Sequence, residues 1–100
     1  MADTLYIIKE NSWIAKFAGF LMRFDKIAIV FGKTIYLHNC KKDDFLANKR
    51  WFAHEMCHIR QYKKYGYLNF IIQYLWESIK KGYTHNKFEV EARAAENEIL

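Results

Sequence analysis

Residues 43–65 read DDFLANKRWFAHEMCHIRQYKKY and contain the strongest helical pattern of the chain. Either Asp43 or Asp44 can cap a helix here, and Gly66 is a suitable residue to end it. Four apolar side chains recur at helical spacing, so that one face is hydrophobic: Phe45, Phe52, Met56 and Ile59. The stretch therefore predicts one long amphipathic helix that packs on the core of the protein.

The residues before this helix predict a small sheet and a first helix. Residues 4–9 are typical of a short strand, and 27–31 and 34–38 are β-rich runs joined by Gly32-Lys33, which indicates a hairpin. Ser12 can cap the first helix. The apolar stripe of that helix is predicted to lie in the core: Trp13, Phe17, Phe20, Leu21 and Phe24.

Two further helices are expected after Gly66. The first, from Tyr67 to about Lys81 with Gly82 at its end, is apolar on nearly every side, which is typical of a central helix or an interface. The last runs from about Asn86 to the end of the chain. Its narrow seam of mostly small residues allows close packing on another helix: Phe88, Ala92, Ala95 and Ile99. The predicted fold class is α+β, with a small antiparallel sheet and hairpin packed on the long helix and on further helices.

Length and composition indicate one domain. The chain has 100 residues, 52% of them hydrophobic, and it contains no proline, repeat or linker-like segment. No apolar run is long enough to cross a bilayer, and no secretory signal is visible at the amino terminus, so a cytoplasmic location is expected. The net charge of +5 comes largely from lysine and arginine pairs, which favour ordinary solvation over a nucleic-acid interface.

The segment His54-Glu55-Met56-Cys57-His58 fits the pattern H-E-x-x-H inside the predicted helix. Four residues make just over one helical turn, so His54 and His58 leave the same face and can bind one tetrahedral zinc ion. Glu55 projects about 100° away around the axis and is suited to act as the general base on a water molecule. Cys57 faces the core side and is expected to be a small buried apolar residue.

A catalytic zinc site needs a third protein ligand and an open fourth position. Histidine at the position typical of metzincins is absent, since Lys64 occupies it. His38 and His85 are the other histidines. A glutamate from another helix is therefore favoured, and Glu89 and Glu91 flank the seam of the last helix on opposite sides. Helical geometry alone does not choose between these two residues.

The motif segment through Tyr62, the aromatic helix that follows and the segment Tyr83 to Arg93 together resemble the minigluzincins, minimal zinc metallopeptidases of about this length. The resemblance extends from about Ile27 to Ala95. It implies a minimal zincin-like fold, peptide-bond hydrolysis and Glu89 as the third ligand. Arg93 departs from the pattern, because many gluzincins have an acidic residue at that position to orient a histidine.

The resemblance also implies a peptide or protein substrate that adds as a strand to a sheet edge. Residues 34–38 are the first candidate for that edge and 27–31 the second. Latent minigluzincins cover the cleft with an amino-terminal segment, which would be residues 1–25 here. Tyr83 and His85 are the nearest aromatic donors in sequence for a tetrahedral oxyanion.

Three functions follow as hypotheses. The first is a zinc endopeptidase, active or latent. The second is a zinc-binding domain that no longer cleaves and serves as a protein-interaction module. The departure from the gluzincin pattern at Arg93 favours this hypothesis. The third is a basic nucleic-acid-binding module with a chance motif, which requires steep salt dependence of binding. Substrate specificity and oligomeric state are not predictable from the sequence.

Overall fold

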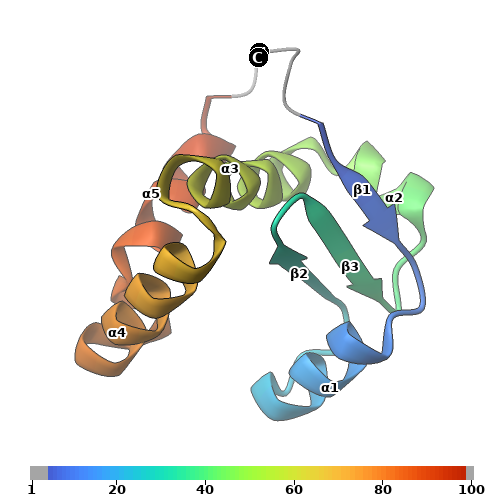
Figure 1. The fold of residues 1–100 in the computed structure, drawn as a ribbon. Coiled ribbons are helices and arrows are strands. Elements are labelled where there is room, and N and C mark those ends of the chain that lie inside the picture. Colours follow the sequence, from blue (N-terminus) through green and yellow to red (C-terminus); the bar gives the residue numbers. More distant parts are fainter. Residues whose placement is uncertain (1–4, 99–100) are drawn as a thin grey trace.

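The computed structural model describes residues 5–98, which form an α+β globule (Figure 1). A three-stranded sheet lies on one side of the central helix α3, and two helices lie on the other. In chain order the elements are β1 (Ile7–Lys9), α1 (Trp13–Met22), β2 (Ile27–Phe31), β3 (Thr34–His38), α2 (Lys42–Ala47), α3 (Lys49–Tyr65), α4 (Tyr67–His85) and α5 (Lys87–Glu96).

The sheet is mixed, not antiparallel as predicted. Its order is β1-β3-β2, with β2 antiparallel and β1 parallel to β3. The parallel pair is possible because α1 connects β1 to the rest of the sheet and reverses the direction of the chain. At the turn between β2 and β3, Gly32 has φ +66°, and a Cβ atom there would lie 2.6 Å from the ring of Tyr67. This position requires glycine.

The predicted long helix over residues 43–65 is two helices separated at Asn48. The Asn48 side chain accepts a hydrogen bond from the Trp51 amide at 3.1 Å and so caps α3. Asp43 and Asp44 lie in the first turn of α2 and cap nothing, since Lys41 precedes the helix without a side-chain cap. The asparagine within the predicted helix thus marks the start of the helix that contains the motif.

The predicted end of the helix after Gly66 is confirmed at Gly82, whose backbone is not helical, with φ +79° and ψ 167°. Beyond this kink a short helical segment extends α4 to His85. Asn86 then caps α5 by accepting a hydrogen bond from the Phe88 amide at 2.8 Å. The Asn86 side chain also donates to the Tyr74 carbonyl and the Ser78 hydroxyl of α4, so one fully buried amide fixes the angle between the two helices.

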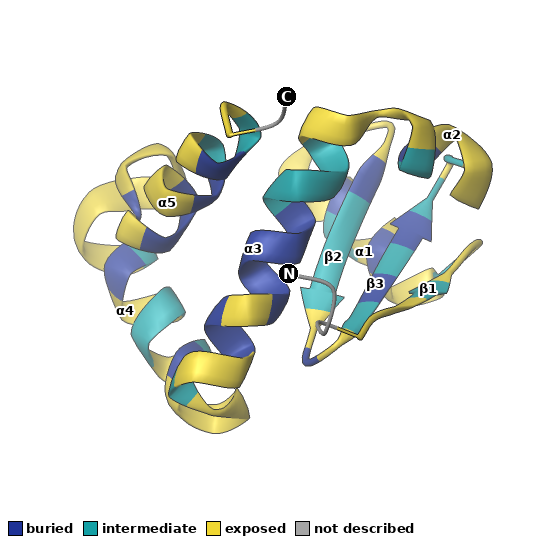
Figure 2. Ribbon diagram, turned by 90° about the horizontal axis from the view of Figure 1, so that it is seen from above, coloured by how far each residue is buried: buried dark blue, intermediate teal, exposed yellow. Residues whose placement is uncertain are grey.

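The core surrounds α3, which is the most buried helix (Figure 2). Met56 and Ile59 pack on Ile35 and Leu37 of β3. On the opposite side of the helix, Cys57 packs against alanines of α5, as expected for a small buried residue. The seam predicted for the last helix is confirmed at Phe88, Ala92 and Ala95, which are buried, whereas Ile99 lies outside the described residues. Close packing of α5 on α3 follows.

The prediction for the first helix was right about its cap and wrong about its core face. Ser12 accepts a hydrogen bond from the Ala15 amide. The residues that α1 buries are Ala15 and Gly19, and a Cβ atom on Gly19 would lie 2.9 Å from the Phe24 carbonyl. The aromatic stripe faces outward, with Trp13 and Phe20 exposed by 76% and 78%. Small residues let α1 approach the sheet closely, which leaves the large ones on the surface.

Within residues 5–98, no helix combines the length and the apolar character that crossing a membrane requires.

Candidate metal centre

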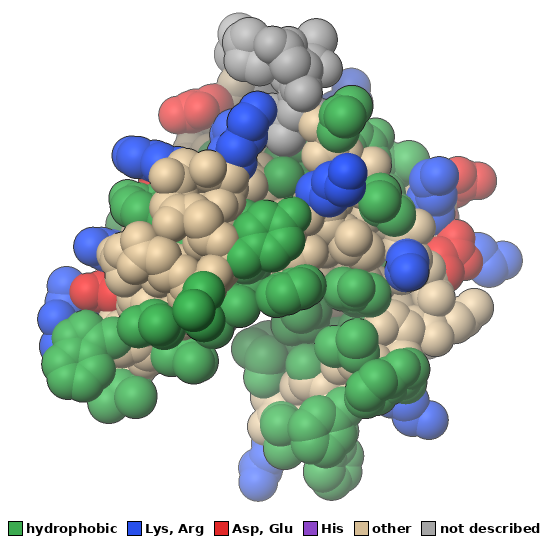
Figure 3. Space-filling view, in the orientation of Figure 1, with side chains coloured by type: hydrophobic (Ala, Val, Ile, Leu, Met, Phe, Trp, Pro, Cys, Tyr) green, Lys and Arg blue, Asp and Glu red, His purple; other side chains and the backbone are tan. Residues whose placement is uncertain are grey.

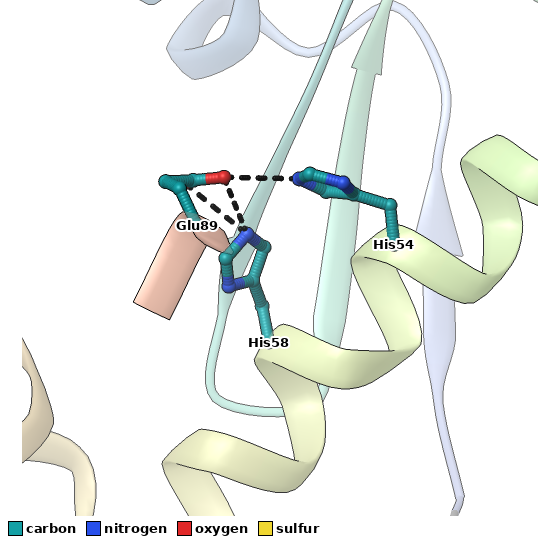
Figure 4. A group of neighbouring side chains, drawn as sticks. All are labelled: His54, His58 and Glu89. Atoms are coloured by element: carbon teal, nitrogen blue, oxygen red, sulfur yellow. Dashed lines mark hydrogen bonds and ion pairs between the residues drawn. The ribbon is translucent and has the colours of Figure 1, made fainter. Parts of the chain in front are cut away.

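The two motif histidines and one glutamate converge at the centre of the molecule. Residues 54 and 58 are one turn apart on α3, and both rings point to the carboxylate of Glu89, which α5 brings against the same face (Figure 4). His54 Nε2 lies 3.0 Å from Glu89 Oε1, and His58 Nε2 lies 3.2 Å from Oε2. The three ligand atoms are all within 4.8 Å of one another, so this group could hold a metal ion.

Each member of the group is held by a further hydrogen bond. His54 Nδ1 lies 2.7 Å from Glu96 Oε2, and His58 Nδ1 lies 2.8 Å from Gln61 Oε1. The Tyr74 hydroxyl donates a hydrogen bond to Glu89 Oε2. These contacts fix the orientation of both rings and of the carboxylate, as the outer partners of metal ligands do. They also leave each Nε2 atom directed at the point where the group converges.

Gln61 is itself positioned from two directions. Its amide nitrogen donates to the Phe88 carbonyl at 3.1 Å and to the carboxylate of Glu91 at 2.6 Å. Because the amide nitrogen is engaged by these acceptors, the amide oxygen faces His58. Glu91, the alternative third ligand in the sequence, therefore contacts the partner of a histidine and is not a member of the group.

The negative charge of Glu89 and the positive charges of His54 and His58 stabilise one another. Burial favours the neutral forms of the carboxyl of Glu89 and of the imidazoles. Hydrogen bonding nevertheless lowers the pKa of Glu89 well below its usual range, because His54 and His58 donate to it. Burial likewise opposes the charged form of His54, yet its hydrogen bond to Glu89 raises the pKa of His54 to about 9. For His58, burial again lowers the pKa, and the hydrogen bond to Glu89 outweighs it, so the pKa is raised. The carboxylate thus attracts positive charge to this point.

Glu55 lies beside the group and does not join it. It is 6% exposed, and burial raises the pKa of its carboxyl to about 7, while the nearby histidines act in the opposite direction. Glu55, both histidines and Glu89 line one cavity of about 780 Å³. The other walls are β2 from Ile27 to Val30, the inner face of α4 and the segment that follows α1. Figure 3 shows the hollow between α4 and the sheet with α1, bordered by hydrophobic side chains.

The two aromatic donors predicted near the end of α4 are placed differently. Tyr83 lines the cavity, and burial together with the charge of Glu89 raises the pKa of its hydroxyl to about 12. His85 is exposed and is not among the cavity-lining residues. His38 lies on β3, outside the group. Of the predicted amino-terminal segment, Met22 and Phe24 line the cavity.

Sequence reasoning missed three residues that hold the group. Glu96 follows Glu89 by seven residues, which is two helical turns, so the spacing alone places both carboxylates on one face of α5. Gln61 follows His58 by three residues, so helical spacing likewise places these two side chains next to each other on α3. Tyr74 comes from a different helix, and no local spacing in the sequence connects it to Glu89.

The departure at Arg93 is compensated within the same helix. The Arg93 guanidinium donates to the Thr84 carbonyl and does not face His54. Glu96, one turn further along α5, provides the carboxylate that orients the ring of His54. Glu96, and not the residue at position 93, is thus the acidic partner of His54.

The chain was also compared with known proteins. No family model, no curated protein and no solved structure matches it. The resemblance to the minigluzincins stays a prediction from the motif residues, and the chemistry of the centre has to be inferred from its own geometry.

Proposed function

We propose that this protein is a zinc-dependent peptidase of the minimal gluzincin type. The observation that supports the proposal most is the convergence of His54, His58 and Glu89 next to Glu55 in the wall of one cavity. Two histidines and one carboxylate with an open side form a donor set known from catalytic zinc sites. The alternative, a zinc-binding interaction module that does not cleave, needs the same ligands but gives no role to Glu55.

Two of the three separations between donor atoms are close to those of a tetrahedral zinc site. Ligand bonds of about 2.0–2.2 Å in a tetrahedral arrangement place neighbouring donor atoms about 3.3 Å apart. The separations of 3.0 and 3.2 Å between the histidine nitrogens and the Glu89 oxygens are within a few tenths of an ångström of that value. An ion held by His54, His58 and Glu89 would replace the protons that these atoms now share.

Zinc, when bound, lowers the pKa of a water molecule toward neutrality and polarises a substrate carbonyl. The chain supplies the remaining steps. The Glu55 carboxylate, on the cavity wall beside the ligands, accepts the proton of the attacking water and passes it to the leaving amine. The Tyr83 hydroxyl keeps its proton at neutral pH and lines the same cavity, so it is the donor for the oxyanion.

An extended substrate has one suitable strand beside this centre. The first candidate, 34–38, is the middle strand and is paired on both sides, which excludes it. The second candidate, β2, is at the edge of the sheet and contributes four residues to the cavity wall. Its free backbone groups can pair with a peptide that runs along the cavity past Glu55.

Two variants test the proposal. The purified chain is expected to contain one zinc ion per molecule by elemental mass spectrometry and to cleave an unfolded protein such as casein. Glu55→Gln should keep the zinc and lose cleavage by about 10²-fold or more, whereas His58→Ala should lose the zinc. Glu98→Gln, an exposed carboxylate after α5, is the control and should change neither. If the wild-type chain holds zinc but does not cleave, cleavage after removal of residues 1–25 would identify a latent peptidase, and continued absence of cleavage would favour the interaction module. A chain without zinc would refute both functions.

A further inference from the structure

Two helices present apolar faces to solvent on opposite sides of the cavity. The exposed apolar residues of α1 are Trp13, Phe17, Phe20 and Leu21, and Phe24, just after the helix, belongs with them. On α4 the exposed set is Leu68, Ile72, Leu75, Trp76 and Ile79. These ten residues are called the apolar rim below. Figure 3 shows hydrophobic side chains gathered on both borders of the hollow, over α4 and over α1.

Both faces point directly away from the core. On α1 the buried residues are Ala15 and Gly19, on the side of the helix opposite Trp13 and Phe17. On α4 the buried residues are Phe70 and Glu77, on the side opposite Ile72 and Ile79. Both faces are therefore largely outside the buried core of the described fold. A helix of this kind is expected to contact another apolar phase.

The exposed area is larger than a monomer in water usually shows. With about 200 Å² for each large side chain, the exposed fractions amount to roughly 650 Å² on α1 with Phe24 and roughly 640 Å² on α4, so each face by itself is at or just above the upper end for the largest apolar patch of a typical monomer. An area of this size indicates an interaction surface.

Basic residues border the apolar rim. From Trp13 to Lys26 there are three of them, Lys16, Arg23 and Lys26, against the single acidic residue Asp25. Near the end of α4, Lys80 and Lys81 lie beside Ile79, and the Lys80 ammonium lies 5.8 Å from the ring centre of Trp76. The one acidic residue of α4, Glu77, is buried, and its carboxylate lies 3.9 Å from the Lys80 ammonium and 3.6 Å from that of Lys81, so one negative charge faces these two positive ones. Tryptophan and lysine together at the edge of an apolar face are typical of helices at a bilayer surface.

The charges decide between the possible occupants. A second copy of the chain seated on the apolar rim would bring two basic borders together in molecules of net charge +5, and like charges oppose that contact. An anionic lipid surface attracts the same lysines and accepts the apolar side chains between its headgroups. No helix of the described residues is suited to span a bilayer, so the contact would be peripheral.

We propose that the apolar rim of α1 and α4 binds the surface of an anionic lipid bilayer. None of the ten side chains belongs to the metal centre, but Phe24 and Leu75 also line the cavity, so the tests use rim residues that do not. Trp13 and Trp76, exposed by 76% and 58%, would enter the headgroup region, while the less exposed Trp51 packs on the core beside Phe45.

Vesicle flotation with the full chain tests the proposal. The protein should float with vesicles of phosphatidylcholine and phosphatidylglycerol and remain in solution with phosphatidylcholine alone. Phe20→Ser combined with Ile79→Ser should weaken binding about tenfold or more. Leu5→Ser combined with Val90→Ser removes exposed apolar side chains elsewhere and should leave binding unchanged. Because all four residues are exposed, each double variant is expected to melt like the wild-type chain.

Tryptophan fluorescence gives a second readout. Brominated lipids in the same vesicles should quench the emission of Trp13 and Trp76, and substituting both by Phe should abolish the quenching. Three results would overturn the proposal: no binding to anionic vesicles, equal binding of the two double variants, or a dimer in solution that Phe20→Ser and Ile79→Ser disrupt while no variant binds vesicles.

Discussion

Removing the Glu96 carboxylate should weaken metal binding although Glu96 is not a ligand. Its Oε2 lies 2.7 Å from His54 Nδ1 and fixes the orientation in which Nε2 faces Glu89. A hydrogen bond to a charged acceptor contributes about 1.5–3 kcal/mol. The Glu96 side chain is 26% exposed, which places its contribution at the lower end of that range. Glu96→Ala is therefore expected to raise the zinc Kd about tenfold.

The assay is competition for zinc against a chromogenic chelator at neutral pH. Glu96→Gln keeps an acceptor but loses the charge, so its Kd should lie between those of Glu96→Ala and the wild-type chain. Glu98→Ala removes the same charge from an exposed position two residues later and controls for the long-range attraction of a cation. If Glu96→Ala and Glu98→Ala show the same Kd, the reasoning about the orientation of His54 is refuted.

Further predictions concern the stability of the fold. Asn86→Ala should lower the free energy of unfolding by about 2–4 kcal/mol, because it removes the cap of α5 and two further hydrogen bonds of a fully buried side chain. Urea titration measures this loss, and an unchanged unfolding midpoint would contradict the prediction. Gly32→Ala should cost about 1–3 kcal/mol, because φ is +66° and the new Cβ would meet the ring of Tyr67. In a Tyr67→Ala background, Gly32→Ala should cost less stability, because the clash with the ring is gone. An equal cost in both backgrounds would mean that the positive φ alone accounts for the destabilisation. The Lys87 amide donates a hydrogen bond to the Glu77 carboxylate and lowers the pKa of Glu77 below 4.5. This contact therefore stabilises the folded state above about pH 4.5, and the stabilisation is lost as the pH falls through the lower pKa of the folded state. Melting curves of Glu77→Gln should therefore change less than those of the wild-type chain on acidification, and parallel curves would be evidence against a role for this contact.

Local patterns in the sequence predicted much of the centre. The four-residue spacing of His54 and His58 is a property of any α-helix, so their common face followed once the helix was recognised. The seam at Phe88, Ala92 and Ala95 predicted close packing of the last helix, and Glu89 lies beside that seam. These features depend on residues near one another in the chain, whose relative positions a helix determines by itself.

Tertiary structure decided the features that local spacing leaves open. The aromatic stripe of α1 has the periodicity of a core face, yet α1 packs on the sheet through Ala15 and Gly19, because a close approach to the Phe24 carbonyl leaves no room for a larger side chain at position 19. Hydrophobic periodicity identifies a helix face but not the surface that the face will contact.

Residue patterns were enough to predict a helix with His54 and His58 on one face and an acidic donor on a later helix, although not the break at Asn48. The packing of the elements was needed to show that Glu89 and not Glu91 faces the histidines, that β2 and not β3 lies beside the cavity, and that Tyr74 and Glu96 contact the group. The physical reason is the same in each case. These relations join elements far apart in the chain, and they depend on the angles and register at which packed helices and strands meet, which local spacing does not contain.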